Sequence, residues 1–257
     1  MIPKIIHYCW FGSKKMPEEY QRYLQSWQKF CPDYQIIGWD QTNYDVTKNH
    51  YMYQAYQRGK WSFVSDYLGF DVVYHYGGIY LDTDVELLKS FDDLLNNQAF
   101  MGFEENEIGF FVNPGLGFGA QKKDPIIKQL LQVYDDLDFV DQKGRLNTLT
   151  IPVYTTNFLK QRGLKQNNQL QEVAGVKLYP TDFFAPMDFL TGEIKLTANT
   201  YSIHHYSATW QTAENLAHIK QIRLINRRFG KKLGMKINWL FRAFWAVKRR
   251  LTAYLKK

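Results

Sequence analysis

Cysteine is scarce in this sequence. Only Cys9 and Cys31 are present among 257 residues, and no further cysteine completes a metal-ligand spacing or a disulfide framework. This excludes a disulfide-stapled scaffold and a cysteine-based zinc site. We expect both thiols to be reduced, as in the cytosol.

Long apolar runs are also missing. No stretch approaches the roughly 18 apolar residues that a membrane-spanning helix needs. The N-terminus enters Ile2–His7 directly, without the apolar core of a signal peptide. The sequence therefore predicts neither secretion nor a membrane span.

Acidic residues are absent from the C-terminal end. From Lys220 to Lys257 there are 13 Lys and Arg and no Asp or Glu, whereas the part before Lys220 has a net charge of −6. The net charge of +7 therefore comes from the tail alone, and a partner of opposite charge is expected there. Hydrophobic residues make up 45% of the chain and aromatic residues 17%. That composition suits one large packed domain with an appendage.

The most informative stretch is Gly77–Glu86, with the sequence Gly-Gly-Ile-Tyr-Leu-Asp-Thr-Asp-Val-Glu. The glycines end a helical pattern, and the apolar residues after them predict a buried strand. If the strand continues, Asp82 and Asp84 point to the same side. Two such carboxylates suit a hard divalent ion that holds a diphosphate. A solvated acidic turn and a phosphatase of the haloacid dehalogenase type are the alternatives.

The rest of the chain alternates strands and helices, and its opening β-α-β unit predicts an α/β fold with a mostly parallel sheet. Strands are expected at Lys4–Trp10, Tyr34–Trp39, Ala99–Phe103, Val173–Tyr179 and Thr200–Tyr206. Helices are expected between Pro17 and Pro32, at Asn49–Arg58, Trp61–Tyr76, Glu86–Leu95 and Pro152–Leu159, and from Asp124 onward. The glycine-rich Asn113–Ala120 is expected to be a loop.

Single residues near a predicted strand end or on the helix Trp61–Tyr76 are further candidates. Trp10 could stack on a flat ring or be a buried aromatic residue, and Asp66 could bind sugar hydroxyls or be a solvated acid. His204 and His205 are neighbours on a strand and point to opposite faces, so at most one of them can reach a given metal. A structural role is the more common one for a strand histidine.

The tail from Leu216 to Lys257 has apolar residues at helical spacing among its basic residues. This pattern is typical of a helix that lies in an anionic membrane interface. A helix that packs on the body with a solvated basic face is the alternative. Nucleic acid is not expected as a partner, because the body is acidic and carries no nucleic-acid motif. We therefore divide the chain into a domain at residues 1–213 and a helical tail at 214–257.

Four ordered motifs together resemble one family. They are Pro3–Gly12, Phe63–Tyr67, Gly77–Asp84 and His204–Trp210. They are similar to glycosyltransferase family 32, the DXD-containing sugar-transferase family, which includes bacterial capsular and exopolysaccharide enzymes and yeast-type mannosyltransferases. The resemblance extends more distantly to the catalytic domains of large clostridial glucosylating toxins and spans roughly residues 2 to 210.

The resemblance implies a GT-A fold, a Rossmann-like mixed sheet flanked by helices, and a retaining transfer from a nucleotide sugar assisted by Mn2+ or Mg2+. A UDP-sugar is favoured as the donor over GDP-mannose, and the acceptor would be a glycan or a lipid-linked oligosaccharide. By position, Asp84 would bind the metal, and Asp82 would contact the ribose, the donor sugar and, through water, the metal. The remaining implied roles belong to Tyr8 and Trp10 at the donor base, Asp66 at the donor-sugar hydroxyls, His205 in the metal shell, and Trp210 over the diphosphate.

One residue departs from the family pattern. Gly69 stands where the family usually carries an arginine that binds the donor. The absence of this arginine implies one of two things. Either the sugar preference has changed, or the protein is catalytically weakened and serves as a sugar- or membrane-binding member of a polysaccharide-assembly complex. The leading expectation remains an active transferase in the cytoplasm, at the inner face of the plasma membrane, that builds a cell-surface polysaccharide.

Overall fold

The computed structural model describes residues 1–207 and 213–254, without the side chains of 213 and 240–254. The chain forms two compact units. The first comprises Met1–Met187 and Lys195–Trp210, and the second comprises Asp188–Ile194 and Gln211–Lys257. The division at residues 213 and 214 into a domain and a tail stays a prediction.

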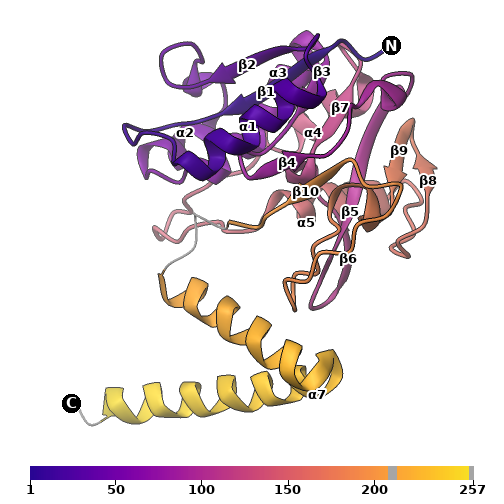
Figure 1. The fold of residues 1–257 in the computed structure, drawn as a ribbon. Helices are drawn as coiled ribbons and strands as arrows, with labels where there is room; N and C mark the ends of the chain where they lie inside the picture. Colours follow the sequence, from indigo (N-terminus) through magenta and orange to yellow (C-terminus); the bar gives the residue numbers. More distant parts are fainter. Residues whose placement is uncertain (208–212, 255–257) are drawn as a thin grey trace. The chain divides into compact units, whose positions relative to one another are not determined.

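The first unit is built on a mixed sheet (Figure 1). Its strands run in the order β2-β1-β3-β7-β5-β9-β8, and β6 pairs with β5. β1 pairs in parallel with both β2 and β3, and β5 with β9, whereas β7 is antiparallel to its two neighbours. The strands are β1 Ile5–Cys9, β2 Gln35–Trp39, β3 Gly78–Tyr80, β5 Ala99–Asn106, β6 Gly109–Val112, β7 Phe118–Ala120, β8 Gln171–Val173 and β9 Val176–Tyr179. The predicted α/β architecture with a mixed sheet is confirmed, but the expectation of a mostly parallel sheet was wrong, because antiparallel pairings join β3, β5, β6, β7, β8 and β9.

Helices connect and cover these strands. The predicted helices around residues 18–30, 50–57, 61–76, 125–132 and 151–160 are confirmed. Asp124 caps one of them, because its Oδ1 accepts hydrogen bonds from the backbone of Ile126 and Ile127. The helices of the first unit are α1 Glu18–Phe30, α2 His50–Gln57, α3 Trp61–Tyr76, α4 Pro125–Gln132, α5 Ile151–Lys160 and α6 Thr181–Phe184, with short 3-10 turns at η1 Val46–Lys48, η2 Asp92–Leu94 and η3 Pro114–Leu116.

Two predicted segments were wrong. The expected helix at Glu86–Leu95 begins instead as strand β4 Val85–Leu87, which pairs antiparallel with β10 Ser202–His204. Val85 and Leu87 are fully buried on either side of the half-buried Glu86, a period of two rather than a helical period. The expected loop Asn113–Ala120 contains η3 and β7, and β7 lies inside the sheet.

Helix α3 is buried on several sides and leads directly to the Asp-x-Asp stretch. It packs against β1, β3 and β7, and also against α2 and α4. It ends at Gly77, whose φ of 71° is in the left-handed region. Gly78 has a φ of 107°, and a Cβ there would lie 2.6 Å from the carbonyl oxygen of Ile5. This glycine pair therefore lets the chain leave the helix and enter β3 against β1.

The second unit contains helix α7 Ala213–Tyr254, which is interrupted at Gly230. None of the helices in the described residues is both long and apolar enough to cross a membrane.

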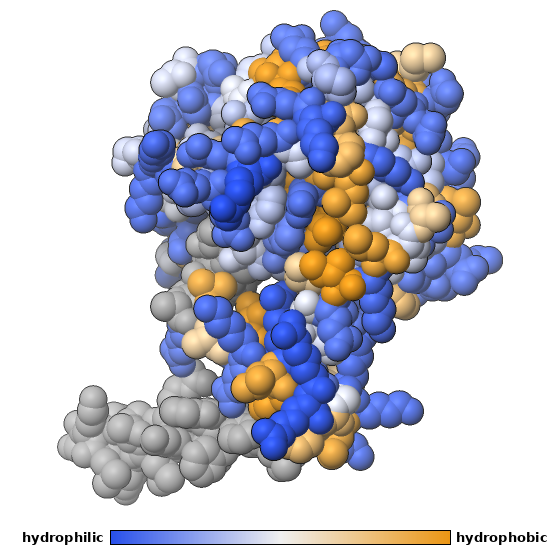
Figure 2. All heavy atoms as spheres, viewed as in Figure 1, coloured by the Kyte–Doolittle hydropathy of each residue, from blue (hydrophilic) through white to orange (hydrophobic). Residues whose placement is uncertain are grey.

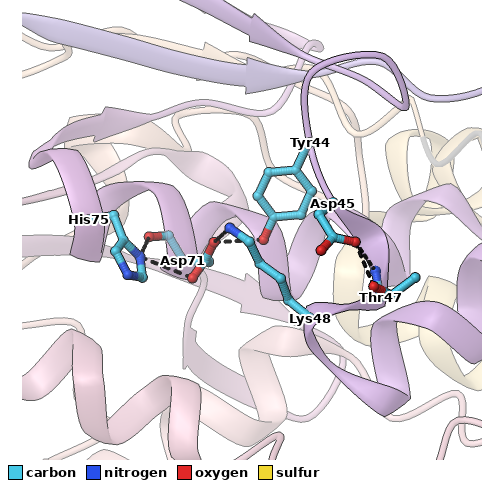
Figure 3. Close-up of polar contacts among 6 residues, drawn as sticks. All are labelled: Tyr44, Asp45, Thr47, Lys48, Asp71 and His75. Carbon is cyan, nitrogen blue, oxygen red and sulfur yellow. Dashed lines mark hydrogen bonds and ion pairs between the residues drawn. The ribbon is translucent and has the colours of Figure 1, made fainter.

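A buried carboxylate attaches the loop before α2 to α3. Asp71 accepts a hydrogen bond from the Tyr44 hydroxyl at 2.8 Å and forms an ion pair with Lys48 Nζ at 3.1 Å (Figure 3). Its other carboxylate oxygen lies 3.1 Å from His75 Nδ1. The Asp71 side chain is only 6% exposed, so these groups replace its water shell. Nearby Asp45 instead accepts hydrogen bonds from Thr47, inside its own exposed turn (Figure 3).

We expect Asp71→Ala to lower the free energy of unfolding by about 2 kcal/mol or more, because it leaves the buried Tyr44 hydroxyl without its acceptor. Asp45→Ala is the matched control, since it removes a carboxylate of the same loop that serves only a local turn. Urea unfolding of both variants measures the difference. Equal losses would contradict the assignment of Asp71 as the attachment point.

Candidate active site

The two aspartates lie on a turn between β3 and β4. The turn is closed by a hydrogen bond from the Val85 backbone N–H to the Asp82 carbonyl at 3.1 Å. The prediction that they extend the strand was wrong, because β3 ends at Tyr80. Their side chains nevertheless come together. One ligand atom each from Asp82, Asp84 and His204 lies within 4.8 Å of the others.

His204 reaches this turn from a distant part of the chain, at the end of β10. β10 pairs with β4 in a register that sets His204 opposite Val85, and His204 Nε2 lies 3.2 Å from Asp84 Oδ1. The segment after β10 continues around the same carboxylate. The Ser207 backbone N–H donates to Asp84 Oδ2 at 2.8 Å, and that of His205 donates to the Asp84 carbonyl at 3.0 Å.

The choice of His205 as the histidine beside the aspartates needs correction. His205 Nε2 lies 2.9 Å from Glu86 Oε2, and the His205 ring stacks on Tyr23 with centroids 4.5 Å apart. Neighbouring residues on an extended segment point to opposite faces, so when His204 turns towards Asp84 its neighbour turns away. The assignment of His205 to the metal shell, made from its spacing to Trp210, stays a prediction, and Trp210 itself lies outside the described residues.

Burial makes the charges of the site strongly dependent on one another. Desolvation and the nearby Asp84 raise the pKa of Asp82 to about 7. Desolvation alone would raise the pKa of Asp84 as well, but His204 and the Ser207 N–H lower it to about 2. Desolvation acts to lower the pKa of His204, and Asp84 outweighs it and raises this pKa to about 9. In the metal-free protein, an imidazolium therefore neutralises one carboxylate of the pair.

Asp66 lies beside this cluster and contributes to a small pocket whose lining includes Asp66, Gly69, Asp82, Gly115 and Ile151. Desolvation, and then the charge of Asp82, raises the pKa of Asp66 well above its ordinary value. No cation pairs with Asp66 in the part of the chain that the structure describes. A Cβ at Gly115 would lie 2.5 Å from Asp82 Oδ2, so only glycine allows the backbone to approach this carboxylate.

Gly69 faces the ring of Tyr80. A Cβ at this position would lie 3.1 Å from the ring, which is tighter than ordinary packing. The Tyr80 hydroxyl in turn lies 3.3 Å from Cys9 Sγ, and both side chains are buried. A side chain at this position would therefore require Tyr80 to shift by a few tenths of an ångström.

The two residues predicted at the donor base lie at the end of β1. Trp10 is half-buried, donates from Nε1 to the Lys14 carbonyl at 2.7 Å, and has its ring edge-on to Tyr20 at 5.7 Å. Tyr8 is half-buried and lies across Gly38 of β2, where a Cβ would be 2.6 Å from the Tyr8 hydroxyl. Neither side chain belongs to the Asp-Asp-His cluster, and their roles stay predictions.

Sequence reasoning missed several residues around the cluster. Tyr20 and Tyr23 lie on α1, which was expected only as a helix. Desolvation and the charge of Asp84 raise the pKa of Tyr20 against the opposing effect of the Ser207 hydroxyl, and the Tyr23 ring stacks on the His205 ring. Glu104 of β5 accepts a hydrogen bond from Asn113 at 2.7 Å and raises the pKa of His204. No local pattern marks Glu104, because it approaches the site only through tertiary packing.

Part of this region matches a known family model. Residues 17–101 match the family model described as "Glycosyltransferase sugar-binding region containing DXD motif". This segment includes the motifs at residues 63–67 and 77–84, but not those at 3–12 and 204–210.

Two fungal proteins are similar over part of the chain. Inositol phosphoceramide mannosyltransferase 3 of Schizosaccharomyces pombe is 30% identical over 42% of this chain and 33% of its own length. Mannosyl phosphorylinositol ceramide synthase SUR1 of Saccharomyces cerevisiae is 30% identical over 39% of this chain and 27% of its own. The chain thus spans about a third of the length of these curated relatives. Among solved structures, the PaToxG glycosyltransferase has a TM-score of 0.48 and 21% identity, over 62% of this chain and 69% of that chain.

The raised pKa of Asp82 gives a prediction for the metal-free protein. This pKa is about 7 in the fold against 3.8 for an ordinary aspartate, so ionisation of Asp82 opposes folding. The penalty is absent below the unfolded pKa, grows as the pH rises, and is complete above about pH 7. Asp82→Asn should therefore raise the melting temperature in chelator at pH 8 and change it much less at pH 4.5.

Thermal unfolding at several pH values measures this difference. Asp136→Asn, an exposed carboxylate away from the site, is the control for the loss of one negative charge. A lower melting temperature of Asp82→Asn at pH 8, or an equal change at both pH values, would show that ionisation of Asp82 does not oppose folding.

Proposed function

We propose that this chain, whose residues 17–101 carry a glycosyltransferase sugar-binding region with its DXD motif, is a metal-dependent retaining glycosyltransferase. It would transfer a hexose from a nucleotide sugar to a glycan or lipid-linked acceptor of a cell-surface polysaccharide. The observation that carries the proposal is the convergence of Asp82, Asp84 and His204 from distant parts of the chain, with Asp66 beside them.

The residues of the cluster fit a divalent ion. Two carboxylates and one imidazole suit Mn2+, and the carboxylates also suit Mg2+. Nδ1 of the buried His204 has no hydrogen-bond partner among the described residues, and its Nε2 is already directed at Asp84. Because a ligating imidazole must be neutral, metal binding would release the proton that His204 holds in the metal-free protein. The bound ion would neutralise the diphosphate leaving group.

The chain's own residues would bind and orient the donor. Asp66 and Asp82 present carboxylate oxygens to one pocket, where they could accept hydrogen bonds from sugar hydroxyls. Tyr8 and Trp10 would contact the base. In a retaining transfer, the bond from the anomeric carbon to the phosphate oxygen breaks and a bond to the acceptor oxygen forms on the same face. The departing phosphate oxygen takes the acceptor proton, so no protein carboxylate need form a covalent intermediate.

The donor sugar is a separate choice within this proposal. The resemblance of the motifs favours a UDP-sugar, whereas the names of both fungal relatives indicate mannose transfer, which makes GDP-mannose the second candidate. Gly69 favours an altered donor preference, because this position supplies no cation and a Cβ there would be in tight contact with the Tyr80 ring. The same observation supports the alternative of a catalytically weakened sugar-binding member of an assembly complex.

Donor hydrolysis tests the proposal. We expect one UDP- or GDP-sugar to raise the melting temperature and to be cleaved in the presence of Mn2+, with both effects lost in chelator. Asp84→Ala should abolish cleavage and keep the fold, whereas the exposed control Asp136→Ala should cleave at the wild-type rate. Undiminished turnover by Asp84→Ala would refute the mechanism. Donor binding without cleavage by the wild type would favour the weakened binding protein.

The two neighbouring histidines form a matched pair for the metal site. His204→Ala should weaken Mn2+ binding by about 100-fold or more, because it removes a ligand, whereas His205→Ala should weaken it by about tenfold at most. Calorimetric titration of each purified variant with Mn2+ measures both affinities. A larger loss of Mn2+ affinity from His205→Ala than from His204→Ala would support His205 as the metal ligand, as the sequence spacing predicted.

We also propose a peripheral location at the inner face of the plasma membrane. A lipid-linked acceptor would be presented there, and the excess of basic residues in the C-terminal 38 residues supports contact with an anionic surface.

A further inference from the structure

Helix α7 is two helical segments rather than one. Gly230, with φ 75° and ψ 155°, interrupts the helix, and the segments on either side run in different directions (Figure 1). A Cβ at Gly234 would overlap the side chain of Asn226, so the two segments are in contact beside the break. This close approach gives the second unit a defined bend.

One side of the first segment is occupied by the loop at residues 188–194. Asn226 Nδ2 donates to the Leu190 carbonyl at 3.0 Å, and Arg227 donates to the carbonyls of Thr191 and Gly192. Lys231 pairs with Asp188 across the same contact. Some of the basic residues of α7 therefore stabilise the unit itself.

Large apolar side chains remain exposed elsewhere on α7. Trp239 is 67% exposed and Leu224 is 68% exposed, and Phe229, Leu233 and Met235 are also exposed. Isolated exposed apolar residues are common on proteins, but a series along one helix indicates a surface that contacts something apolar.

Four residues of the second segment form what we call the Trp239 patch. Lys232, Met235, Lys236 and Trp239 line one surface hollow and follow the spacing i, i+3, i+4, i+7, which places them on one helix face. Apolar and basic side chains alternate on the described part of α7 in Figure 2. In the first segment, Lys220, Leu224 and Arg228 repeat the arrangement of an exposed apolar residue between two exposed basic residues.

The chemistry of the patch selects its partner. An exposed tryptophan and methionine can enter the boundary between headgroups and acyl chains, while lysine stems extend along the apolar surface and keep their ammonium groups among the headgroups. The absence of acids from Lys220 onward means that an anionic surface meets no repulsion there. A nucleic acid would match the charge but offer nothing to the exposed Met235 and Leu224.

We infer that the Trp239 patch inserts into the interface of an anionic lipid bilayer, with Leu224 as a second contact. This rests on the proposed function only for the identity of the acceptor at that surface. Binding to lipid is measured without donor or acceptor, so its failure and the failure of transferase activity can be distinguished.

Vesicle flotation of the full chain tests the inference. The wild type should float with phosphatidylcholine vesicles that contain 30% phosphatidylglycerol, and far less with pure phosphatidylcholine. Trp239→Ser should reduce the partition coefficient at least about tenfold, through the loss of buried apolar area. Each of Lys232→Gln and Lys236→Gln should reduce it about fivefold, and added salt should diminish that difference.

Matched controls lie on the first unit. Leu170→Ser removes an apolar residue that is 55% exposed, and Lys160→Gln and Lys165→Gln remove exposed charges; all three should float like the wild type. Equal flotation by Trp239→Ser and Leu170→Ser would overturn the inference. So would wild-type flotation that ignores lipid charge. If the wild type does not float and light scattering shows a dimer that Trp239→Ser converts to a monomer, the patch would instead be assigned to contact with a second copy of the chain. Binding to duplex DNA but not to vesicles would assign it to nucleic acid.

Discussion

The site depends on holding two carboxylates close together where water is largely excluded. Asp82 and Asp84 would repel each other as anions, and the fold supports them in different ways. Asp84 receives the His204 imidazolium and a backbone N–H, whereas Asp82 retains a raised pKa and sits against the bare Cα of Gly115. This asymmetry leaves a place for one further positive charge, which is the property a metal–diphosphate site requires.

Three separate features of the chain are needed to build that arrangement. The glycines after α3 turn the chain into β3, the pairing of β4 with β10 brings in His204, and the segment after β10 supplies the Ser207 N–H. Two of them come from a point about 120 residues beyond the aspartates, so long-range strand pairing rather than local sequence assembles the charge balance. The first unit must therefore be folded before His204 and the Ser207 N–H can lower the free-energy cost of holding the ionised carboxylates close together.

Local patterns were sufficient for much of the fold. Helices α2 and α3 follow from apolar spacing and from the glycines that end them, and β1, α1 and β2 follow from apolar runs separated by proline. Asp82 and Asp84 were found because paired acidic residues after a buried strand are unusual, whereas Asp66 was found from its helix before them and from the family resemblance. Sequence could not select His204 over His205, because the choice depends on the strand register with β4. It also could not reveal Glu104, which reaches His204 only through packing. Nor could it reveal β7, because the glycines of this strand are typical of a loop, and only the structure shows that Phe100 packs against Gly119.

The uneven distribution of charge suggests why membrane contact would be left to the tail. The chain before Lys220 has a net charge of −6, so an anionic bilayer repels it, whereas the tail attracts that surface strongly. An acidic body would have a second consequence under the proposed function, because a nucleotide-sugar donor and the bilayer would both be anionic. A net positive charge on the body would attract it to the lipid headgroups. An excess of basic residues confined to the tail would separate attraction to the surface from recognition of the donor, which would then depend on a bound metal ion instead of a basic cleft.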